Sequence, residues 1–281
     1  MIPSAALLLS WLGASALALD SSPPPVSCVV QRQMVVCPVA AGSLETLAFV
    51  VDTGTRRTVL DTRVADRLNL NRRSQEVLAL GSTVRAGAAV VSSLRFGPLA
   101  SRDLPVSICD LGSLASVLGA RPDGILGMDV LGQGSLTIDY RRAQVLIGPV
   151  ESLTHRAALH LTSAGFPAID VAVGGERIQL VLDTGMDGIL IFSPSRALGP
   201  PQAREILEGR GLSGPVTLVR APLPCLWIAG TCVDAAEATV VEGRELRDAY
   251  GAEGLLGPRT LNAAVVTLDF ARHQFGWQPR E

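Results

Sequence analysis

Apolar residues along this chain come in short runs and alternations that are typical of β-strands. Residues 34–51 alternate or run apolar on either side of Ala41-Gly42-Ser43, and residues 166–182 do the same around Gly174-Gly175. Apolar segments of this length, interrupted by Gly or Ser, indicate strands joined by tight turns. We therefore predict a β-hairpin over each of these two ranges.

Each predicted hairpin leads into the same short motif. The apolar run stops at Asp-Thr-Gly and then resumes, in FVVDTGTRRTVL at residues 49–60 and in LVLDTGMDGILI at residues 180–191. One such triplet is weak evidence, because Asp and Gly are common in turns of no special function. Two triplets in matched apolar settings, with Asp52 and Asp183 lying 131 residues apart, indicate a repeat.

Two further pairs of segments recur at almost the same offset. DGILGMDVL at residues 123–131 matches EGLLGPRTL at residues 253–261, and LTIDYRRAQ at residues 136–144 matches VTLDFARHQ at residues 266–274. Three landmarks in one order, with offsets that agree to within one residue, predict an internal duplication. Asp139 and Asp269, which recur with the last pair, are interpreted as surface or turn-facing carboxylates.

The remaining pattern predicts further strands and a few short helices. Strands are expected at residues 58–60 and 188–192, and a hairpin at residues 77–91 with its tip near residues 82–86. Asp61 or Thr62 is expected to cap the first helix, because both residue types accept hydrogen bonds from free amides at a helix start. The expected helices are residues 63–68, 113–118, 202–208 and 242–249.

The repeated motifs resemble the aspartic peptidases of the pepsin and retropepsin type, and most closely the short two-lobed bacterial retropepsin-like proteins. In that family an Asp-Thr/Ser-Gly turn in each lobe is followed by a strand with two apolar residues before a Gly. Asp52-Thr53-Gly54 pairs in this way with Ile125-Leu126-Gly127, and Asp183-Thr184-Gly185 with Leu255-Leu256-Gly257. The resemblance covers nearly the whole chain after about residue 28.

The resemblance implies a mostly β, bilobal acid-protease fold, with two duplicated β-barrel lobes and a few short helices. The expected organisation is a signal peptide at residues 1–18, a Pro- and Ser-rich linker at 19–27, an N-terminal lobe at 28–148, an interlobe connection at 149–156 and a C-terminal lobe at 157–281.

The resemblance also implies a site in which two aspartates, one from each lobe, activate water. The expected catalytic pair is Asp52 and Asp183. The residues expected to support the pair are Thr53, Gly54, Thr55, Thr184 and Gly185, and the residues expected in a flap over the substrate are Gly81, Ser82, Thr83, Val84 and Arg85.

The two turns differ at their fourth position. Thr55 offers a hydroxyl to its aspartate, whereas Met186 offers none and departs from the small residue that is usual in the family. We therefore hypothesise that Asp52 is the better stabilised anion and that Asp183 carries the shared proton. The two groups titrate as a unit, so this assignment concerns where the proton resides most of the time.

Composition excludes several other chemistries. The formal net charge of −2 gives no basic surface for nucleic acid, and the absence of Lys removes Ser-Lys and Schiff-base mechanisms. The 3 histidines form no zinc-binding pattern, there is no GxSxG motif, and the glycines form no phosphate-binding loop. We expect neither a metal nor another cofactor.

The N-terminus and the cysteines indicate export. Residues 5–19 are apolar and precede a Pro-rich stretch, as in a secretory signal, although no Lys or Arg precedes them. An uncleaved membrane anchor or a misassigned start is the alternative, and without such an anchor no stable membrane association is expected. Cys28 with Cys37, and Cys225 with Cys232, are candidate hairpin disulfides; the alternative is buried thiols, as expected for Cys109.

The leading hypothesis from the sequence is a monomeric aspartic endopeptidase, periplasmic or secreted, that acts on peptides or proteins. A non-catalytic binding or inhibitor protein on the same scaffold is the alternative, because a fold alone does not establish activity. A site completed only by homodimerisation is a third possibility, although the chain carries both half-sites.

Overall fold

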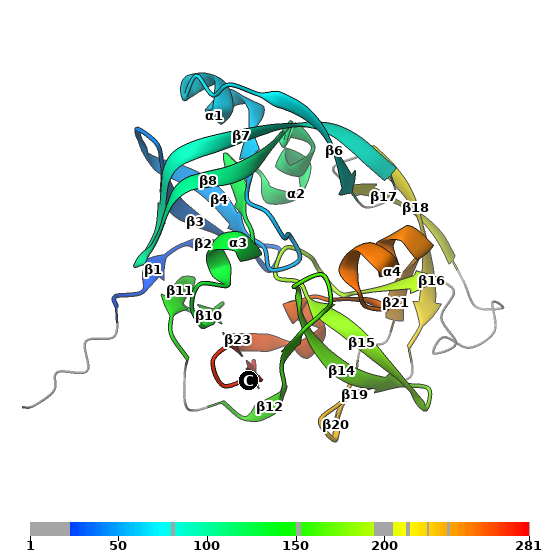
Figure 1. Cartoon of the computed structure of the whole chain (residues 1–281). Coiled ribbons are helices and arrows are strands. Elements are labelled where there is room, and N and C mark those ends of the chain that lie inside the picture. The colour runs from blue at the N-terminus through cyan, green and yellow to red at the C-terminus, as the bar shows by residue number, and fades with distance from the viewer. Residues whose placement is uncertain are drawn as a thin grey trace, which may run out of the picture.

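The computed structural model describes residues 23–79, 82–149, 153–193, 205–211, 214–223, 225–234 and 237–280 of the 281-residue chain (Figure 1). The expected signal peptide, residues 19–22 of the expected linker and Gly81 lie outside these residues. The described chain folds into three curled β-sheets with a few short helices. The prediction of a mostly β protein is therefore confirmed.

One sheet of eight strands is formed by the N-terminal half of the chain. Its strands are β2 (Val29–Gln31), β3 (Met34–Ala41), β4 (Leu44–Val51), β5 (Val59–Asp61), β6 (Arg73–Ala79), β7 (Ser82–Phe96), β8 (Leu99–Cys109) and β9 (Gly124–Leu126). They lie in the order β2–β3–β4–β9–β5–β8–β7–β6, and an additional pairing of β3 with β7 curls the sheet onto itself. The long β6–β7 hairpin arches across the top of the molecule in Figure 1.

A second sheet of ten strands is formed by the C-terminal half. Its strands are β13 (His160–Leu161), β14 (Pro167–Val173), β15 (Glu176–Leu182), β16 (Ile189–Ser193), β17 (Glu205–Gly211), β18 (Gly214–Pro222), β19 (Leu226–Ile228), β20 (Thr231–Val233), β21 (Glu237–Glu242) and β22 (Gly254–Leu256). Their order is β17–β18–β21–β16–β22–β15–β14–β19–β20, with β13 paired to β14.

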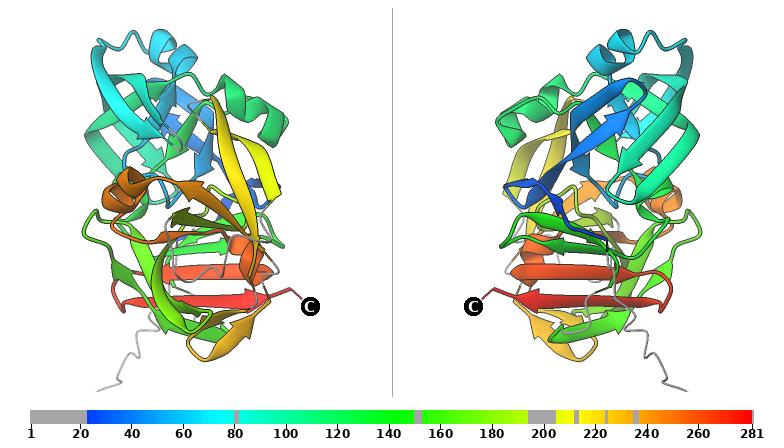
Figure 2. Two further views of the ribbon diagram at one scale, coloured as in Figure 1. Left: turned by 90° about the vertical axis from the view of Figure 1, so that its right-hand side faces the viewer. Right: turned by 90° about the vertical axis from the view of Figure 1, so that its left-hand side faces the viewer.

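A third sheet of six strands joins the two halves. Its strands are β1 (Val26–Ser27), β10 (Leu136–Asp139), β11 (Gln144–Ile147), β12 (His155–Ala158), β23 (Ala263–Asp269) and β24 (Gln274–Pro279). The order is β1–β11–β10–β23–β24–β12, so that β10 pairs with β23, its counterpart in the sequence repeat. Thr137 faces Thr267 in this pairing, and their hydroxyl oxygens lie 2.7 Å apart. The orange and red strands of this sheet lie in the lower part of both views in Figure 2.

Two of the expected hairpins form as the sequence predicts. β3 and β4 turn at Gly42, which has a φ of 57°, and β14 and β15 turn at Gly174 and Gly175, whose φ values are 57° and 86°. In the β14–β15 turn the positive φ at both central residues matches the right-handed twist of the paired strands, and in both turns glycine adopts positive φ without strain.

Three of the four expected helices are present. They are α1 (Thr62–Arg67), the short helical stretch η1 (Gly112–Leu114) with α2 (Ala115–Leu118), and α4 (Arg244–Tyr250). Asp61 caps α1 and accepts a 3.0 Å hydrogen bond from the amide of Arg63, as expected. Two further turns, α3 (Met128–Leu131) and η3 (Pro258–Leu261), follow the Gly residues after β9 and β22.

The expected helix at residues 202–208 is wrong. Residues 205–211 form strand β17, which pairs with β18 along its whole length, and residues 202–204 lie outside the described chain. The β17–β18 hairpin occupies the place in the C-terminal half that β6–β7 occupies in the N-terminal half. Pairing with β18 therefore makes residues 205–211 a strand.

The expected hairpin tip near residues 82–86 is also wrong. Ala79 pairs with Ser82, and residues 82–86 belong to β7, where Arg85 pairs with Glu76 and Ala86 with Gln75 of β6. Gly87, which suggested a turn, lies inside β7 because its backbone packs against Ile108: a Cβ at this position would lie 3.2 Å from the Ile108 side chain.

Two expected boundaries differ by a few residues. β1 begins at Val26, within the expected linker, because it pairs with β11. β12 begins at His155, within the expected connection, because it pairs with β24 as an edge strand.

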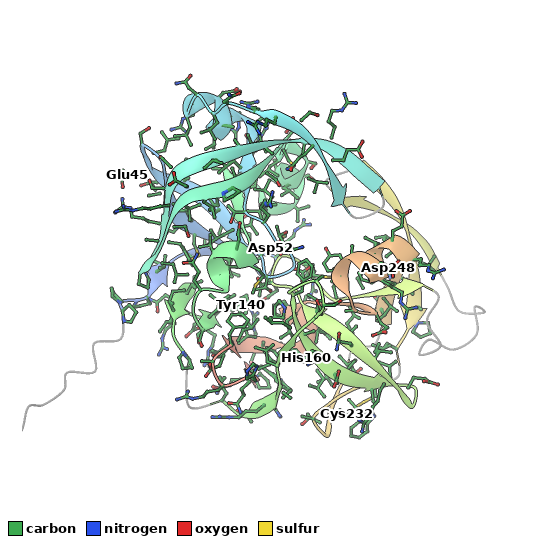
Figure 3. All side chains as sticks on the ribbon, in the orientation of Figure 1. Glu45, Asp52, Tyr140, His160, Cys232 and Asp248 are labelled. Carbon is green, nitrogen blue, oxygen red and sulfur yellow. A yellow bond between two sulfur atoms is a disulfide. The ribbon has the colours of Figure 1, made fainter. Side chains whose placement is uncertain are left out.

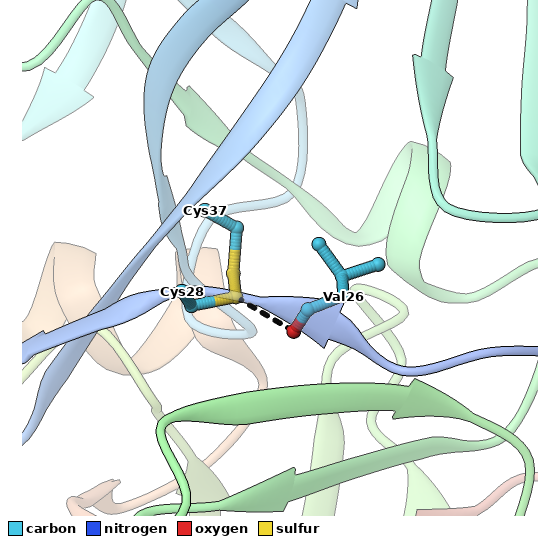
Figure 4. Close-up of a disulfide and its surroundings, with 3 residues drawn as sticks. All are labelled: Val26, Cys28 and Cys37. Atoms are coloured by element: carbon cyan, nitrogen blue, oxygen red, sulfur yellow. Dashed lines mark hydrogen bonds between the residues drawn. A yellow bond between two sulfur atoms is a disulfide. The ribbon is translucent and has the colours of Figure 1, made fainter.

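Both expected disulfides are present in the structure. Cys28 joins Cys37 and Cys225 joins Cys232, while Cys109 is a buried free thiol. The first disulfide ties β3 to the segment between β1 and β2, where the sulfur of Cys28 lies 3.3 Å from the carbonyl oxygen of Val26 (Figure 4).

Candidate active site

Asp52 and Asp183 leave the two large sheets in the same way. β4 runs parallel to β9 and ends at Val51. The amide of the next residue, Asp52, donates a 3.1 Å hydrogen bond to the carbonyl oxygen of Leu126. In the same way, β15 runs parallel to β22 and ends at Leu182. The amide of Asp183 donates a 3.0 Å hydrogen bond to the carbonyl oxygen of Leu256. The apolar residues before Gly127 and Gly257 therefore hold each aspartate turn from below.

The two turns are joined by a reciprocal hydrogen-bond network. The hydroxyl of Thr53 donates to the carbonyl oxygen of Leu182 at 2.6 Å, and the hydroxyl of Thr184 donates to that of Val51 at 2.8 Å. Each hydroxyl also accepts the backbone amide of the other threonine at 3.1 Å. Both threonines are buried, so these bonds are shielded from water and fix one turn against the other.

The two carboxyls meet because the turns contain glycine. The amide of Gly54 donates to Asp52 Oδ1 and the amide of Gly185 donates to Asp183 Oδ1, both at 2.8 Å. A Cβ on Gly185 would lie 2.5 Å from Cγ of Asp52, and a Cβ on Gly54 would overlap the carboxyl of Asp183. Each glycine thus lets the opposite carboxyl approach. Asp52 lies near the centre of the molecule (Figure 3).

The hydrogen-bonding environment of the two carboxyls is unequal. The hydroxyl of Thr55 donates to Asp52 Oδ2 at 2.7 Å. Met186, at the equivalent position, has no hydroxyl to give to Asp183. Among the described residues, the Asp52 carboxyl therefore receives a hydroxyl donor that the Asp183 carboxyl lacks.

The pKa values of both carboxyls lie above the ordinary value for aspartate. Burial raises the pKa of Asp52, and the hydrogen bonds from Thr55 and Gly54 offset part of this rise. Burial, followed by the neighbouring charge of Asp52, raises the pKa of Asp183 well above its ordinary value. When the pair shares one proton, these shifts favour an ionised Asp52 beside a protonated Asp183, which combines a base and an acid in one site.

The pair opens into an apolar cavity of about 400 Å³, here called the aspartate cavity. One wall comes from the N-terminal half and includes Met34, Val59, Leu114 and Leu118; the other comes from the C-terminal half and includes Phe166, Leu190, Leu246 and Tyr250. These walls belong to two small hydrophobic clusters that flank the main core. The cavity accommodates apolar side chains and presents polar groups mainly at its floor.

The expected flap residues are only partly described. The β6–β7 hairpin contributes Val77 of β6 to the aspartate cavity. Ser82, Thr83 and Val84 lie in β7, and the exposed Arg85 beside them does not line the cavity. Gly81 lies outside the described residues.

A hydrogen-bond network between Thr58 and Asp129, which the sequence did not predict, supports the chain after the first aspartate turn. The carboxyl of Asp129 accepts the hydroxyl of the buried Thr58 at 2.7 Å and its amide at 3.0 Å, and the amide of Asp129 donates to the carbonyl oxygen of Arg56 at 3.1 Å. The amide of Gly127 in turn donates to the hydroxyl of Thr58 at 3.2 Å. The signal in the sequence was the difference between GMDVL and GPRTL, since the second copy has Arg259 in place of this aspartate.

Asp139 and Asp269 close turns, as expected, but they are buried. Asp139 accepts the amides of Arg141 and Arg142 at 2.9 Å, and Asp269 accepts the hydroxyl of Ser135 at 2.9 Å. Burial alone would raise the pKa of Asp269, but hydrogen bonds from Arg272 and Ser135 lower it below its ordinary value. Neither carboxyl lines the aspartate cavity.

The described residues show neither a metal-binding cluster nor a membrane-spanning helix. Within those ranges, no group of three or more His, Cys, Asp or Glu side chains is arranged to hold a metal ion. In the same part of the chain, no helix has the length and apolar character needed to cross a membrane.

Comparison with known proteins finds that part of the N-terminal half of the chain matches a protein family. No curated protein matches the sequence. Residues 37–130 match a protein family described as "Aspartyl protease". The matched segment contains Asp52-Thr53-Gly54 and the strand that ends at Gly127, and it stops before Asp183. The N-terminal half of this chain is thus similar to aspartyl proteases.

Proposed function

We propose that this protein is an aspartic endopeptidase whose catalytic residues are Asp52 and Asp183. The observation that carries the proposal is the contact of the two carboxyls at the floor of one cavity, held by the reciprocal bonds of Thr53 and Thr184. The match of residues 37–130 to aspartyl proteases supports the same reaction class.

In the proposed mechanism the ionised Asp52 accepts a proton from a water molecule that lies between the carboxyls. The protonated Asp183 donates its proton to the carbonyl oxygen of the scissile peptide bond as the water oxygen attacks the carbonyl carbon. In the breakdown of the tetrahedral intermediate the C–N bond breaks as the newly protonated Asp52 gives its proton to the leaving nitrogen. The ionised Asp183 takes the proton of one hydroxyl as the carbonyl re-forms, which restores the starting protonation of the pair. Apolar side chains on both sides of the scissile bond fit the walls of the aspartate cavity.

The proposed setting is outside the cytoplasm. Two disulfides are stable in oxidising compartments and rare where thiols are kept reduced. Removal of residues 1–18 as a signal peptide, a duplicated two-lobed organisation and a monomeric enzyme form part of the same proposal.

The experiment that tests the proposal is cleavage of a diverse peptide mixture from about pH 3 to about pH 8 by the chain without residues 1–18. We expect wild type to cut, and Asp52→Asn and Asp183→Asn each to lose activity. Asp187→Asn is the matched control, because this carboxyl lies in the same loop as Asp183 but pairs with Arg259 at 3.1 Å and does not line the cavity. A folded wild-type chain that cuts nothing at any pH would refute the proposal and favour a binding protein.

A further inference from the structure

A second hollow lies beside the aspartate cavity and shares Arg57 with it. This hollow, here called the arginine hollow, has a volume of about 460 Å³. Its lining includes Arg57, Asn71, Arg73, Ala88, Val90 and Pro105. Because Arg57 lines both, the two cavities lie on either side of one side chain.

The two arginines reach the hollow from different parts of the fold. Arg57 lies in the turn that follows Asp52, and Arg73 is the first residue of β6, the strand that also contributes Val77 to the aspartate cavity. The floor between them is formed by small and apolar residues of β7 and β8. The arginine hollow is therefore lined by elements that also line the aspartate cavity.

The charges of the arginine hollow are uncompensated. Arg57 and Arg73 are exposed, and neither guanidinium has an ion pair or a hydrogen bond to another described residue. No carboxylate is among the described residues that line the hollow. The adjacent Arg72, by contrast, points to α1 and pairs with Asp66.

Two guanidinium groups at one concave surface favour an anionic ligand. A guanidinium presents planar, paired N–H donors that match a carboxylate, so one carboxylate can be bound by both groups. Asn71 adds a neutral amide to the same surface. An uncharged ligand of the same shape would leave both cations without a partner.

We propose that the arginine hollow is a specificity subsite that binds a Glu or Asp side chain of the peptide substrate between Arg57 and Arg73. The inference rests on the proposed peptidase function, and it concerns a substrate residue a few positions away from the bond that is cleaved. The apolar walls select the residues next to the scissile bond, and the arginine hollow selects an acidic residue further along the peptide.

The test is a scan with matched peptides of one sequence, amidated at the C-terminus, in which a single Glu or its neutral isostere Gln is placed at each position in turn. At one position we expect kcat/KM to be about tenfold higher for Glu than for Gln, a modest ratio because the arginines are exposed to solvent. We expect Arg57→Gln and Arg73→Gln each to bring this ratio close to one. Arg102→Gln is the matched control, because Arg102 is an exposed arginine of β8 that lines neither cavity, and it should keep the wild-type ratio.

A binding measurement separates this inference from the proposed function. Asp52→Asn should bind the preferred Glu peptide more tightly than the Gln peptide, and added salt should reduce the difference because exposed charges are screened. If wild type cleaves peptides but shows no preference for Glu at any position, the subsite is refuted and the peptidase stands. If nothing is cleaved, an Arg73-dependent preference in binding still supports the acidic subsite, and its absence refutes it. A preference seen only with peptides that have a free C-terminal carboxylate would refute a side-chain subsite.

Discussion

The hydroxyl of Thr184 is the group whose removal tests most directly how the two aspartate turns are held together. Thr184→Val replaces the hydroxyl with a methyl group of similar size, so the change creates little cavity. It removes the 2.8 Å bond to the carbonyl oxygen of Val51 and leaves the amide of Thr53, which donates to the same hydroxyl at 3.1 Å, buried without an acceptor.

The expected loss of stability follows from these two contacts. A lost hydrogen bond contributes about 1 kcal/mol, and a buried amide without a partner costs about 1–3 kcal/mol, which together lower the free energy of unfolding by about 2–4 kcal/mol. For a chain of this size the melting temperature should fall by about 5–15 °C. The carboxyls should also shift relative to each other, and a displacement of about 1 Å at reacting groups lowers kcat by about 100-fold.

The assay compares melting temperature and kcat for wild type, Thr184→Val and Thr267→Val. Thr267 is the matched control, because its buried hydroxyl contacts that of Thr137 at 2.7 Å in the sheet that joins the two halves, and it does not line the aspartate cavity. We expect the control to lose some stability and to keep its kcat. The reasoning is refuted if Thr184→Val keeps the melting temperature and kcat of wild type. It is also refuted if Thr267→Val loses as much kcat as Thr184→Val.

Three further changes test other parts of the structure. Gly185→Ala places a methyl group 2.5 Å from Cγ of Asp52 and should lower kcat by about 100-fold or more with the fold retained, as followed by circular dichroism. Asp183→Asn should melt at a higher temperature than wild type at neutral pH. The raised pKa of Asp183 means that the folded chain holds a proton that the unfolded chain has lost, so wild-type stability falls as pH rises above about 4, and the advantage of the variant should vanish in stronger acid. Asp61→Asn should lower the free energy of unfolding by about 2–3 kcal/mol at neutral pH, because the buried carboxyl accepts bonds from Arg63, Leu111 and Arg121. Burial raises the pKa of Asp61, but these bonds lower it below its ordinary value, so its contribution is present above about pH 4 and fades as pH falls; denaturant titrations at several pH values that show a constant difference would contradict this.

The sequence by itself determined the mostly β fold and the place of the candidate site. Alternation around Gly42 and Gly174 located two hairpins correctly, because the apolar period and the glycine turns are both local properties. The repeated Asp-Thr-Gly motif identified Asp52 and Asp183 as the residues that meet, because the two copies of one motif occupy corresponding turns. The spacing of the cysteines located both disulfides.

Only the tertiary structure decided features that depend on residues distant in the chain. A helix was expected at residues 202–208 as the counterpart of the helix at residues 63–68, but residues 205–211 pair with β18 and form a strand. The bond from Thr58 to Asp129 joins residues 71 positions apart, so the sequence around either residue does not identify the other as its partner. Arg57 and Arg73 come together at one hollow because a turn and a strand start lie side by side in space, and no periodicity in the sequence encodes that proximity. Local patterns thus specify strands and turns, whereas the partners of polar side chains are set by the packing of the sheets.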